Sequence, residues 1–105
     1  MLIEVGRTID IPEGEARRFE VNGVEIAVAN MGGGRFLALG DVCSHAESSL
    51  SEGEVDLDDD TIECPRHGSV FDLCTGRPKS LPATLPVPSF PVKVEGETIL
   101  IEVED

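Results

Sequence analysis

Apolar and polar residues alternate along both ends of this 105-residue chain. Alternating runs at 19–21 and 24–28 are separated by Asn22-Gly23, and runs at 90–94 and 99–103 end the chain. An apolar period of two is typical of β-strands, and Asn-Gly between two such runs predicts a tight hairpin. The pattern therefore predicts an all-β protein with an antiparallel scaffold built from both ends of the chain.

The middle of the chain gives weaker strand signals, and loops connect them. We expect one domain, residues 1–105, in which residues of about 41–77 form a loop-built insertion. Four prolines follow within residues 81–91, and because proline fixes its own φ and donates no hydrogen bond, this segment is predicted to be a stiff extended loop. The shorter candidate strands are 2–5, 8–11, 35–39, 54–57, 61–63 and 70–73.

Composition and charge exclude several classes of protein. The formal net charge of -13 argues against binding to nucleic acid or an anionic membrane surface, since both repel an acidic protein. It suits docking to a basic patch on another protein, although an acidic surface also simply keeps a protein soluble. Neither an export signal nor an apolar run long enough to span a bilayer is visible, so a cytoplasmic protein is expected.

Two short segments combine the scarcest metal-binding side chains of the chain. CSHAESSL, residues 43–50, contains Cys43 and His45, and CPRHGSVF, residues 64–71, contains Cys64 and His67. They hold both histidines and two of the three cysteines. A Cys-x-His or Cys-x-x-His loop allows two side chains to converge on one ion, so the paired arrangement predicts a metal site. Considered one by one, these residues would be read as ordinary surface or core side chains.

The order of the ligands bears on which metal they bind. Zinc fingers pair like ligands, Cys with Cys and then His with His, whereas each loop here offers one of each kind. That order suits two metal atoms, one bound by two thiolates and the other by two imidazoles. A [2Fe–2S] cluster in which two His replace two Cys on one iron fits this description. Zinc in a small interaction module remains an alternative, which an absorbance spectrum would separate because zinc is colourless.

The motif resembles that of the Rieske [2Fe–2S] proteins. Cys43-Ser44-His45, eighteen intervening residues, and Cys64-Pro65-Arg66-His67-Gly68 match the family signature. The likeness continues through the proline-rich segment and the closing strands, so it covers most of the chain. The resemblance implies a Rieske-like antiparallel β-sandwich with an inserted cluster-binding subdomain. It also implies one cluster per chain, with Cys43 and Cys64 on one iron and His45 and His67 on the other.

Departures from subtypes of the family narrow the expected function. Rieske subunits of cytochrome bc complexes carry an extra cysteine in each loop, where this chain has Ser48 and Arg66. Those subunits also use a Ser and a Tyr to donate hydrogen bonds to cluster sulfurs. Ser69 matches the Ser, but Phe71 replaces the Tyr and cannot donate. The resemblance is therefore to the low-potential ferredoxins that serve Rieske oxygenases.

The expected function is electron transfer without catalysis. The catalytic subunits of Rieske oxygenases need two further His and a carboxylate for a mononuclear iron, and the cluster uses both histidines of this chain. The chain is predicted to be a monomer that passes single electrons from a flavoprotein reductase to a Rieske-type oxygenase. The alternative is an accessory subunit of a larger redox enzyme, such as a nitrite reductase or an iron–sulfur assembly system.

Three other features are not interpreted as sites. Asp56, Asp58 and Asp60 alternate as in an EF-hand loop, but the Gly and Glu that such a loop requires are missing. The NMGGG segment, residues 30–34, lacks the Gly-Lys-Ser/Thr of a phosphate loop and is predicted to be a turn. Cys74 has no histidine partner in the sequence and is expected to be a partly buried thiol.

Overall fold

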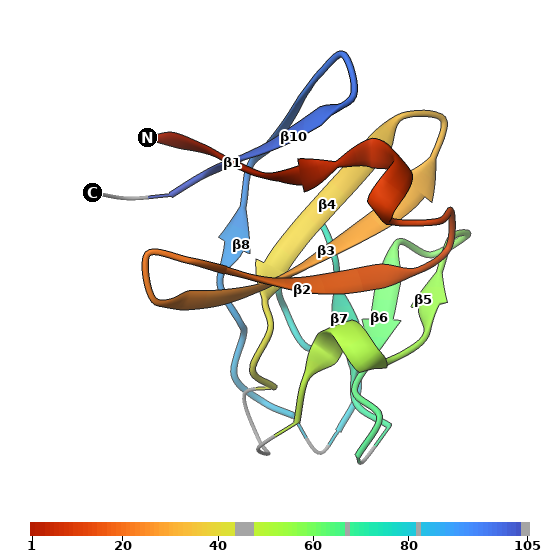
Figure 1. The fold of residues 1–105 in the computed structure, drawn as a ribbon. Helices are drawn as coiled ribbons and strands as arrows, with labels where there is room; N and C mark the ends of the chain where they lie inside the picture. The colour runs from red at the N-terminus through yellow and green to blue at the C-terminus, as the bar shows by residue number, and fades with distance from the viewer. Residues whose placement is uncertain (44–47, 67, 82, 104–105) are drawn as a thin grey trace.

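The computed structural model describes residues 1–43, 48–66, 68–81 and 83–103. Within these ranges the chain forms three antiparallel sheets, and Figure 1 shows their arrangement. The first sheet contains β1 (Leu2–Arg7), β10 (Thr98–Glu102) and β9 (Val92–Glu95). The second contains β2 (Ala16–Val21), β3 (Val24–Gly32), β4 (Arg35–Gly40) and β8 (Ser89–Phe90). The third contains β5 (Val55–Asp56), β6 (Thr61–Glu63) and β7 (Val70–Asp72).

The first two sheets form a β-sandwich and confirm the predicted fold class. The β2–β3 hairpin turns at Asn22 and Gly23, whose φ angles of 50° and 82° are those of the tight turn expected for Asn-Gly. Alternate side chains of both sheets point inward, so the period of two in the sequence becomes one apolar core. Its buried residues are Ile11, Val21, Ile26, Val28, Phe36, Ala38, Ile99, Ile101 and Val103.

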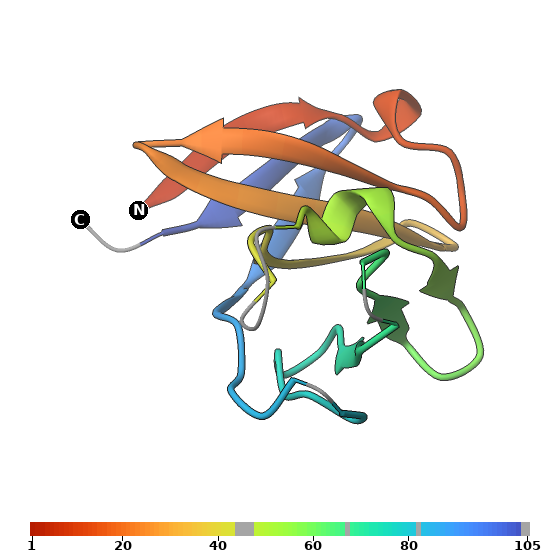
Figure 2. The ribbon, with the colours of Figure 1, turned by 90° about the horizontal axis from the view of Figure 1, so that it is seen from below.

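The third sheet belongs to a separate layer at one end of the sandwich. Figure 2 shows β5, β6, β7 and the segment before β8 lying below the two larger sheets. A second apolar core joins this layer to the outer faces of β3 and β4, which point away from the first sheet. Because that core contains Ala27, Ala29 and Leu39 of the sandwich as well as Ile62 and Phe71 of the third sheet, the inserted layer is packed on the scaffold.

Two elements differ from the sequence-based expectation. Residues 8–10 form a 3-10 helix, η1 (Thr8–Asp10), where a strand was predicted. The Asp10 carboxylate accepts the Arg7 backbone N–H at 3.0 Å, and this local bond bends the chain away from the sheet after β1. The proline-rich segment ends in the short edge strand β8, since Ser89 and Phe90 pair with Leu39 and Ala38 of β4.

The glycine-rich turn is shorter than predicted. β3 continues through Gly32, and Gly33 and Gly34 alone connect it to β4. Both have positive φ angles, 64° and 81°, which glycine adopts without steric cost. No helix of the described residues is long and apolar enough to cross a membrane.

Candidate metal centre

The two cysteines of the predicted site lie in the same apolar core. Cys43 comes three residues after β4 and is 3% exposed, and Cys64 directly follows β6 and is fully buried. Both belong to the core cluster that includes Leu50, Ile62 and Phe71. Strands from two different sheets therefore deliver the two thiols to one buried region.

The loops that begin at these cysteines are closed in the same way. The N–H of Cys43 donates to the carbonyl of Ser48 at 2.9 Å, and the N–H of Cys64 donates to the carbonyl of Ser69 at 2.7 Å. In both loops the acceptor lies five residues after the cysteine. Although the two loops share little sequence, their bases form a matched pair.

The predicted imidazole ligands, His45 and His67, lie outside the described residues. Each follows its cysteine within one of the two matched loops. The structure therefore brings the loops of Cys43 and Cys64 together at the level of their cysteines. Among the described residues no group of three or more His, Cys, Asp or Glu side chains could hold a metal ion, so the four-ligand set stays a prediction.

A backbone contact braces the first loop against the second. Gly53 directly follows η2 (Leu50–Glu52), and a Cβ added at Gly53 would lie 1.7 Å from the carbonyl oxygen of Glu63. Glu63 is the residue directly before Cys64, and its N–H donates to the carbonyl of Glu54 at 2.9 Å. Only glycine allows this approach, which fixes the distance between the two cysteine-bearing segments.

The second loop is also tied to the proline-rich segment by two serine hydroxyls. The buried Ser69 Oγ accepts the Ala83 N–H at 3.1 Å, and the Ser80 Oγ accepts the Val70 N–H at 2.9 Å. The Val87 N–H donates to the carbonyl of Gly76 at 2.9 Å. These bonds place residues 83–87 beside the Cys64 loop, and Figure 1 shows this segment at the end of the molecule where the chain leaves β4 and β6.

Cys74 is exposed, so the expectation of a partly buried thiol is wrong. It lies on the turn after β7, and its Sγ is 3.7 Å from Nη2 of Arg35. Arg35 also donates two hydrogen bonds to the Asp60 carboxylate, at 3.0 and 2.7 Å. The hydrogen bond and charge of Arg35 lower the pKa of Asp60. Cys74 thus belongs to an exposed polar group of β4 and the β5–β6 turn, outside the core that holds the other two cysteines.

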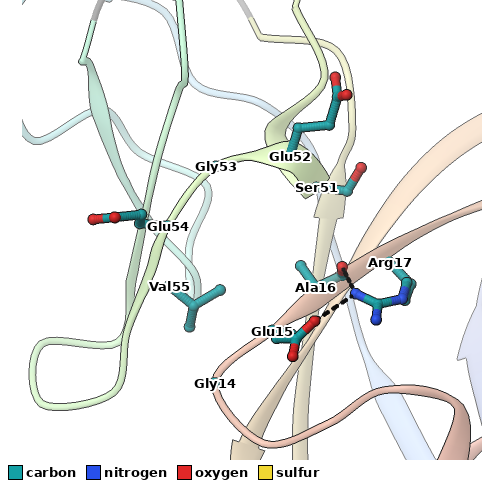
Figure 3. Close-up of a pocket in the computed structure, with 9 residues that line it drawn as sticks. All are labelled: Gly14, Glu15, Ala16, Arg17, Ser51, Glu52, Gly53, Glu54 and Val55. Atoms are coloured by element: carbon teal, nitrogen blue, oxygen red, sulfur yellow. Dashed lines mark hydrogen bonds and ion pairs between the residues drawn. The ribbon is translucent and has the colours of Figure 1, made fainter.

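A surface depression lies between η2 and the start of β2, and its lining is mainly polar. Figure 3 shows its lining, which comes from residues 14–17 on one side and 51–55 on the other. Arg17 forms an ion pair with Glu15 at 3.0 Å and donates to the carbonyl of Ala16 at 2.9 Å. Because neither Cys43 nor Cys64 lines this depression, it is not part of the candidate metal centre.

The residues present fit the thiolate half of a [2Fe–2S] centre. Two cysteines in an apolar core bind as thiolates only where a cation balances their charge, and soft thiolates are the ligands that iron–sulfur clusters use. Each of the two matched loops presents one of these cysteines to the same core. Cys43 and Cys64 would hold one iron, and His45 and His67 the other.

Known proteins agree with this geometry. The Rieske [2Fe-2S] domain family matches residues 1–91. A 3-phenylpropionate/cinnamic acid dioxygenase ferredoxin subunit of Shigella boydii is 48% identical over 96 residues, which cover 91% of this chain and 88% of that protein. The ferredoxin of carbazole 1,9a-dioxygenase from Nocardioides aromaticivorans is 35% identical, with a TM-score of 0.93 and 99% of both chains covered.

A second solved structure, a complex of reduced oxygenase and oxidized ferredoxin in carbazole 1,9a-dioxygenase, contains a chain that is 37% identical. Its TM-score is 0.84, and the match covers 98% of this chain and 97% of that chain. The β-sandwich and the paired cysteine loops define a cluster-binding domain, and the chain belongs to the Rieske [2Fe-2S] family. Its named relatives are ferredoxin subunits, which are electron-transfer components rather than catalytic ones.

Two hydroxyl variants test the expected low potential. A hydroxyl that donates to a cluster sulfur favours the reduced, more negative state, so Ser69→Ala should lower the midpoint potential and Phe71→Tyr should raise it. Redox titration should place the unmodified protein in the lower half of the range of about -150 to +300 mV for Rieske centres.

Ser69→Ala also leaves the buried Ala83 N–H without its acceptor, at a cost of about 1–3 kcal/mol. Ser80→Ala is the matched control, because it removes the neighbouring hydroxyl anchor from an exposed position. Equal shifts in Ser69→Ala and Ser80→Ala would show that loop anchoring, rather than a donor to the cluster, sets the potential.

Proposed function

We propose that the chain is an electron carrier that passes single electrons from a flavoprotein reductase to a Rieske-type non-heme iron oxygenase. The observation that carries this proposal is the pair of matched loops with buried cysteines, in a chain 48% identical to a dioxygenase ferredoxin subunit. A bound [2Fe–2S] cluster supplies one-electron storage. Cys43 and Cys64 would hold it from the apolar core, and the partner would dock at the end of the molecule that carries the two cysteine segments.

The described residues of the loop ends form a mainly apolar surface. Leu81 is 77% exposed, Leu85 is 63% exposed and Val42 is also exposed. Among residues 48, 64–66, 68, 81 and 83–88, Arg66 is the one charged side chain. The acidic turn at 56–60 lies elsewhere, beside the β3–β4 hairpin, where Asp60 pairs with Arg35. We infer that the partner contact is apolar at short range and that acidic residues act on it from a distance.

The net charge of -13 should make electron transfer depend on salt. A strongly acidic carrier attracts a basic partner over about one Debye length, which falls from ~10 Å at 0.1 M to ~3 Å at 1 M. Stopped-flow oxidation of the reduced protein by a terminal oxygenase should therefore slow about tenfold or more across this series, through the association rate. The oxygenase of 3-phenylpropionate dioxygenase is a suitable acceptor.

Charge variants locate the source of the attraction. If the whole field of the protein acts, Asp58→Asn/Asp59→Asn and Glu4→Gln/Glu95→Gln should each weaken the salt dependence to a similar extent, since each removes two charges. A larger effect of the first pair would mean that the partner contacts the β5–β6 turn. A salt-independent rate would contradict steering, while absence of any electron transfer at low salt would contradict the proposed function.

We also propose that the chain acts as a monomer in the cytoplasm. The alternative role, as an accessory subunit of a larger redox enzyme, predicts a different partner. Copurification of the tagged protein from its own cells separates the two. A carrier should elute alone at the mass of one chain, and an accessory subunit should elute in a stable complex.

A further inference from the structure

A buried carboxylate lies at the base of the first cysteine loop. Asp41 directly follows β4, stands two residues before Cys43 and is 2% exposed. Its Oδ1 accepts the backbone N–H of Ser51 at 2.9 Å, and its Oδ2 accepts the hydroxyl of Ser49 at 2.5 Å. The carboxylate therefore joins the segment that enters the loop to the segment that leaves it.

The backbone repeats this connection. The Leu50 N–H donates to the carbonyl of Asp41 at 2.7 Å, Val42 and Ser49 form an antiparallel bridge, and the Cys43 N–H donates to the carbonyl of Ser48. Asp41 thus begins a short antiparallel pairing of two segments, and Cys43 ends it. Three adjacent residue pairs therefore connect Asp41 to the residue that carries the thiol.

Among the described residues, Arg18 is the cation that contacts this carboxylate. Nε of Arg18, on β2, is 3.7 Å from Oδ2 of Asp41, and the same guanidinium pairs with Glu25 on β3. Arg18 is 45% exposed, so solvent screens its charge. The hydrogen bond and charge of Glu25, followed by the charges of Asp41 and Glu20, raise the pKa of Arg18. Because Glu25 shares the guanidinium, Arg18 balances the buried charge of Asp41 only in part.

The second loop has no equivalent charge among its described contacts. Its anchors are the neutral hydroxyls of Ser69 and Ser80. The buried fixed charge near the two cysteines is therefore asymmetric, with a desolvated carboxylate on the Cys43 side, whereas Arg66 of the second loop is exposed. Charges in such a low-dielectric position act more strongly than equal charges on the surface.

We propose that Asp41 is a positioning residue that holds the Cys43 loop and lowers the reduction potential of the bound cluster, with Arg18 opposing it. Reduction adds one negative charge, which the nearby carboxylate disfavours and the guanidinium favours. This inference rests on the proposed function only in that the protein binds a [2Fe–2S] cluster. It does not depend on which partner receives the electron.

The test is a redox titration of the loaded protein and three variants. Asp41→Asn keeps an oxygen for the Ser51 N–H and removes the charge, so the midpoint potential should rise. Arg18→Gln should lower it, and Asp41→Asn/Arg18→Gln should lie between the two. Arg17→Gln is the matched control, because Arg17 on the same strand pairs with Glu15 and should leave the potential unchanged. Shifts of equal sign in Asp41→Asn and Arg18→Gln would overturn the proposal.

Hydrogen exchange of the loaded protein tests the positioning role separately. The Ser51 amide should exchange faster in Asp41→Ala than in Asp41→Asn, which retains an acceptor, and equal rates would overturn that role. If Asp41→Asn does not take up the cluster, Arg18→Gln decides the electrostatic part, since an unchanged potential there overturns it. A protein that shows these shifts but gives no electrons to an oxygenase would contradict the proposed function alone.

Discussion

Cys43→Ser and Cys64→Ser should each yield a colourless protein, whereas Cys74→Ser should keep the visible absorbance of the iron–sulfur centre. The first two thiols are buried in one core at the bases of the matched loops, and Cys74 is exposed beside Arg35. Metal binding is coupled to folding, so loss of the cluster should also lower the unfolding temperature. Burial of an unpaired serine hydroxyl in this core should lower the free energy of unfolding by a further ~1–3 kcal/mol.

His45→Ala and His67→Ala should be colourless too if these residues bind the second iron. Absorbance, iron content and far-UV circular dichroism should be measured together for all five variants. A variant that keeps the far-UV circular dichroism of a β protein but contains no iron has lost a ligand. A variant that loses both the iron and this circular dichroism signal has a folding defect. A coloured Cys43→Ser protein beside a bleached Cys74→Ser protein would contradict the assignment.

Gly53→Ala should be among the most destabilising substitutions of the chain. The φ and ψ angles of Gly53, -86° and 177°, suit alanine, so backbone entropy alone predicts a gain of about 0.4–1 kcal/mol. The added methyl would instead lie 1.7 Å from the carbonyl oxygen of Glu63, and neither backbone can move without displacing Cys64 or η2. We expect a loss of about 3 kcal/mol, out of about 5–15 kcal/mol for a domain.

Gly34→Ala is the matched control for this substitution. Gly34 has a φ of 81° and no atom near its added Cβ, so strain alone should cost about 1–2 kcal/mol. Urea unfolding of the loaded proteins measures both effects. A Gly53→Ala protein as stable as Gly34→Ala, or more stable, would mean that the two cysteine segments do not touch as described.

The scaffold could be predicted from the sequence because its signals are local. The Asn22-Gly23 hairpin and the terminal strands follow from the alternation of neighbouring residues, and most of the shorter strands were found where they were expected. η1 was not, because TIDI alternates like a strand and the bond from Arg7 to Asp10 outweighs that pattern. The run expected at 90–94 is divided at Pro91 into β8, which pairs with β4, and β9, which pairs with β10.

The sequence indicates candidate ligands for the site, whose assignment stays a prediction, but it does not indicate the contacts that hold their loops. The spacing of the Cys/His pairs is visible in one dimension. The contacts that hold the loops join residues far apart in sequence, as with Arg18 and Asp41 or Gly53 and Glu63. An arginine in a strand and a glycine after a serine-rich segment carry no local signal of that role. Such supports follow only from the packing of three sheets.

The matched closure of the two loops has a consequence for the speed of electron transfer. The amides of Cys43 and Cys64 are both bonded to carbonyls of their own loops, and the side chains around the two sulfurs are packed in the core. Dipoles held in this way cannot reorient when the charge nearby changes by one electron. The reorganisation energy on the cysteine side should therefore be small. Most of the nuclear rearrangement that accompanies each electron transfer should then occur in the water and in the partner protein, on the side of the site away from the cysteines.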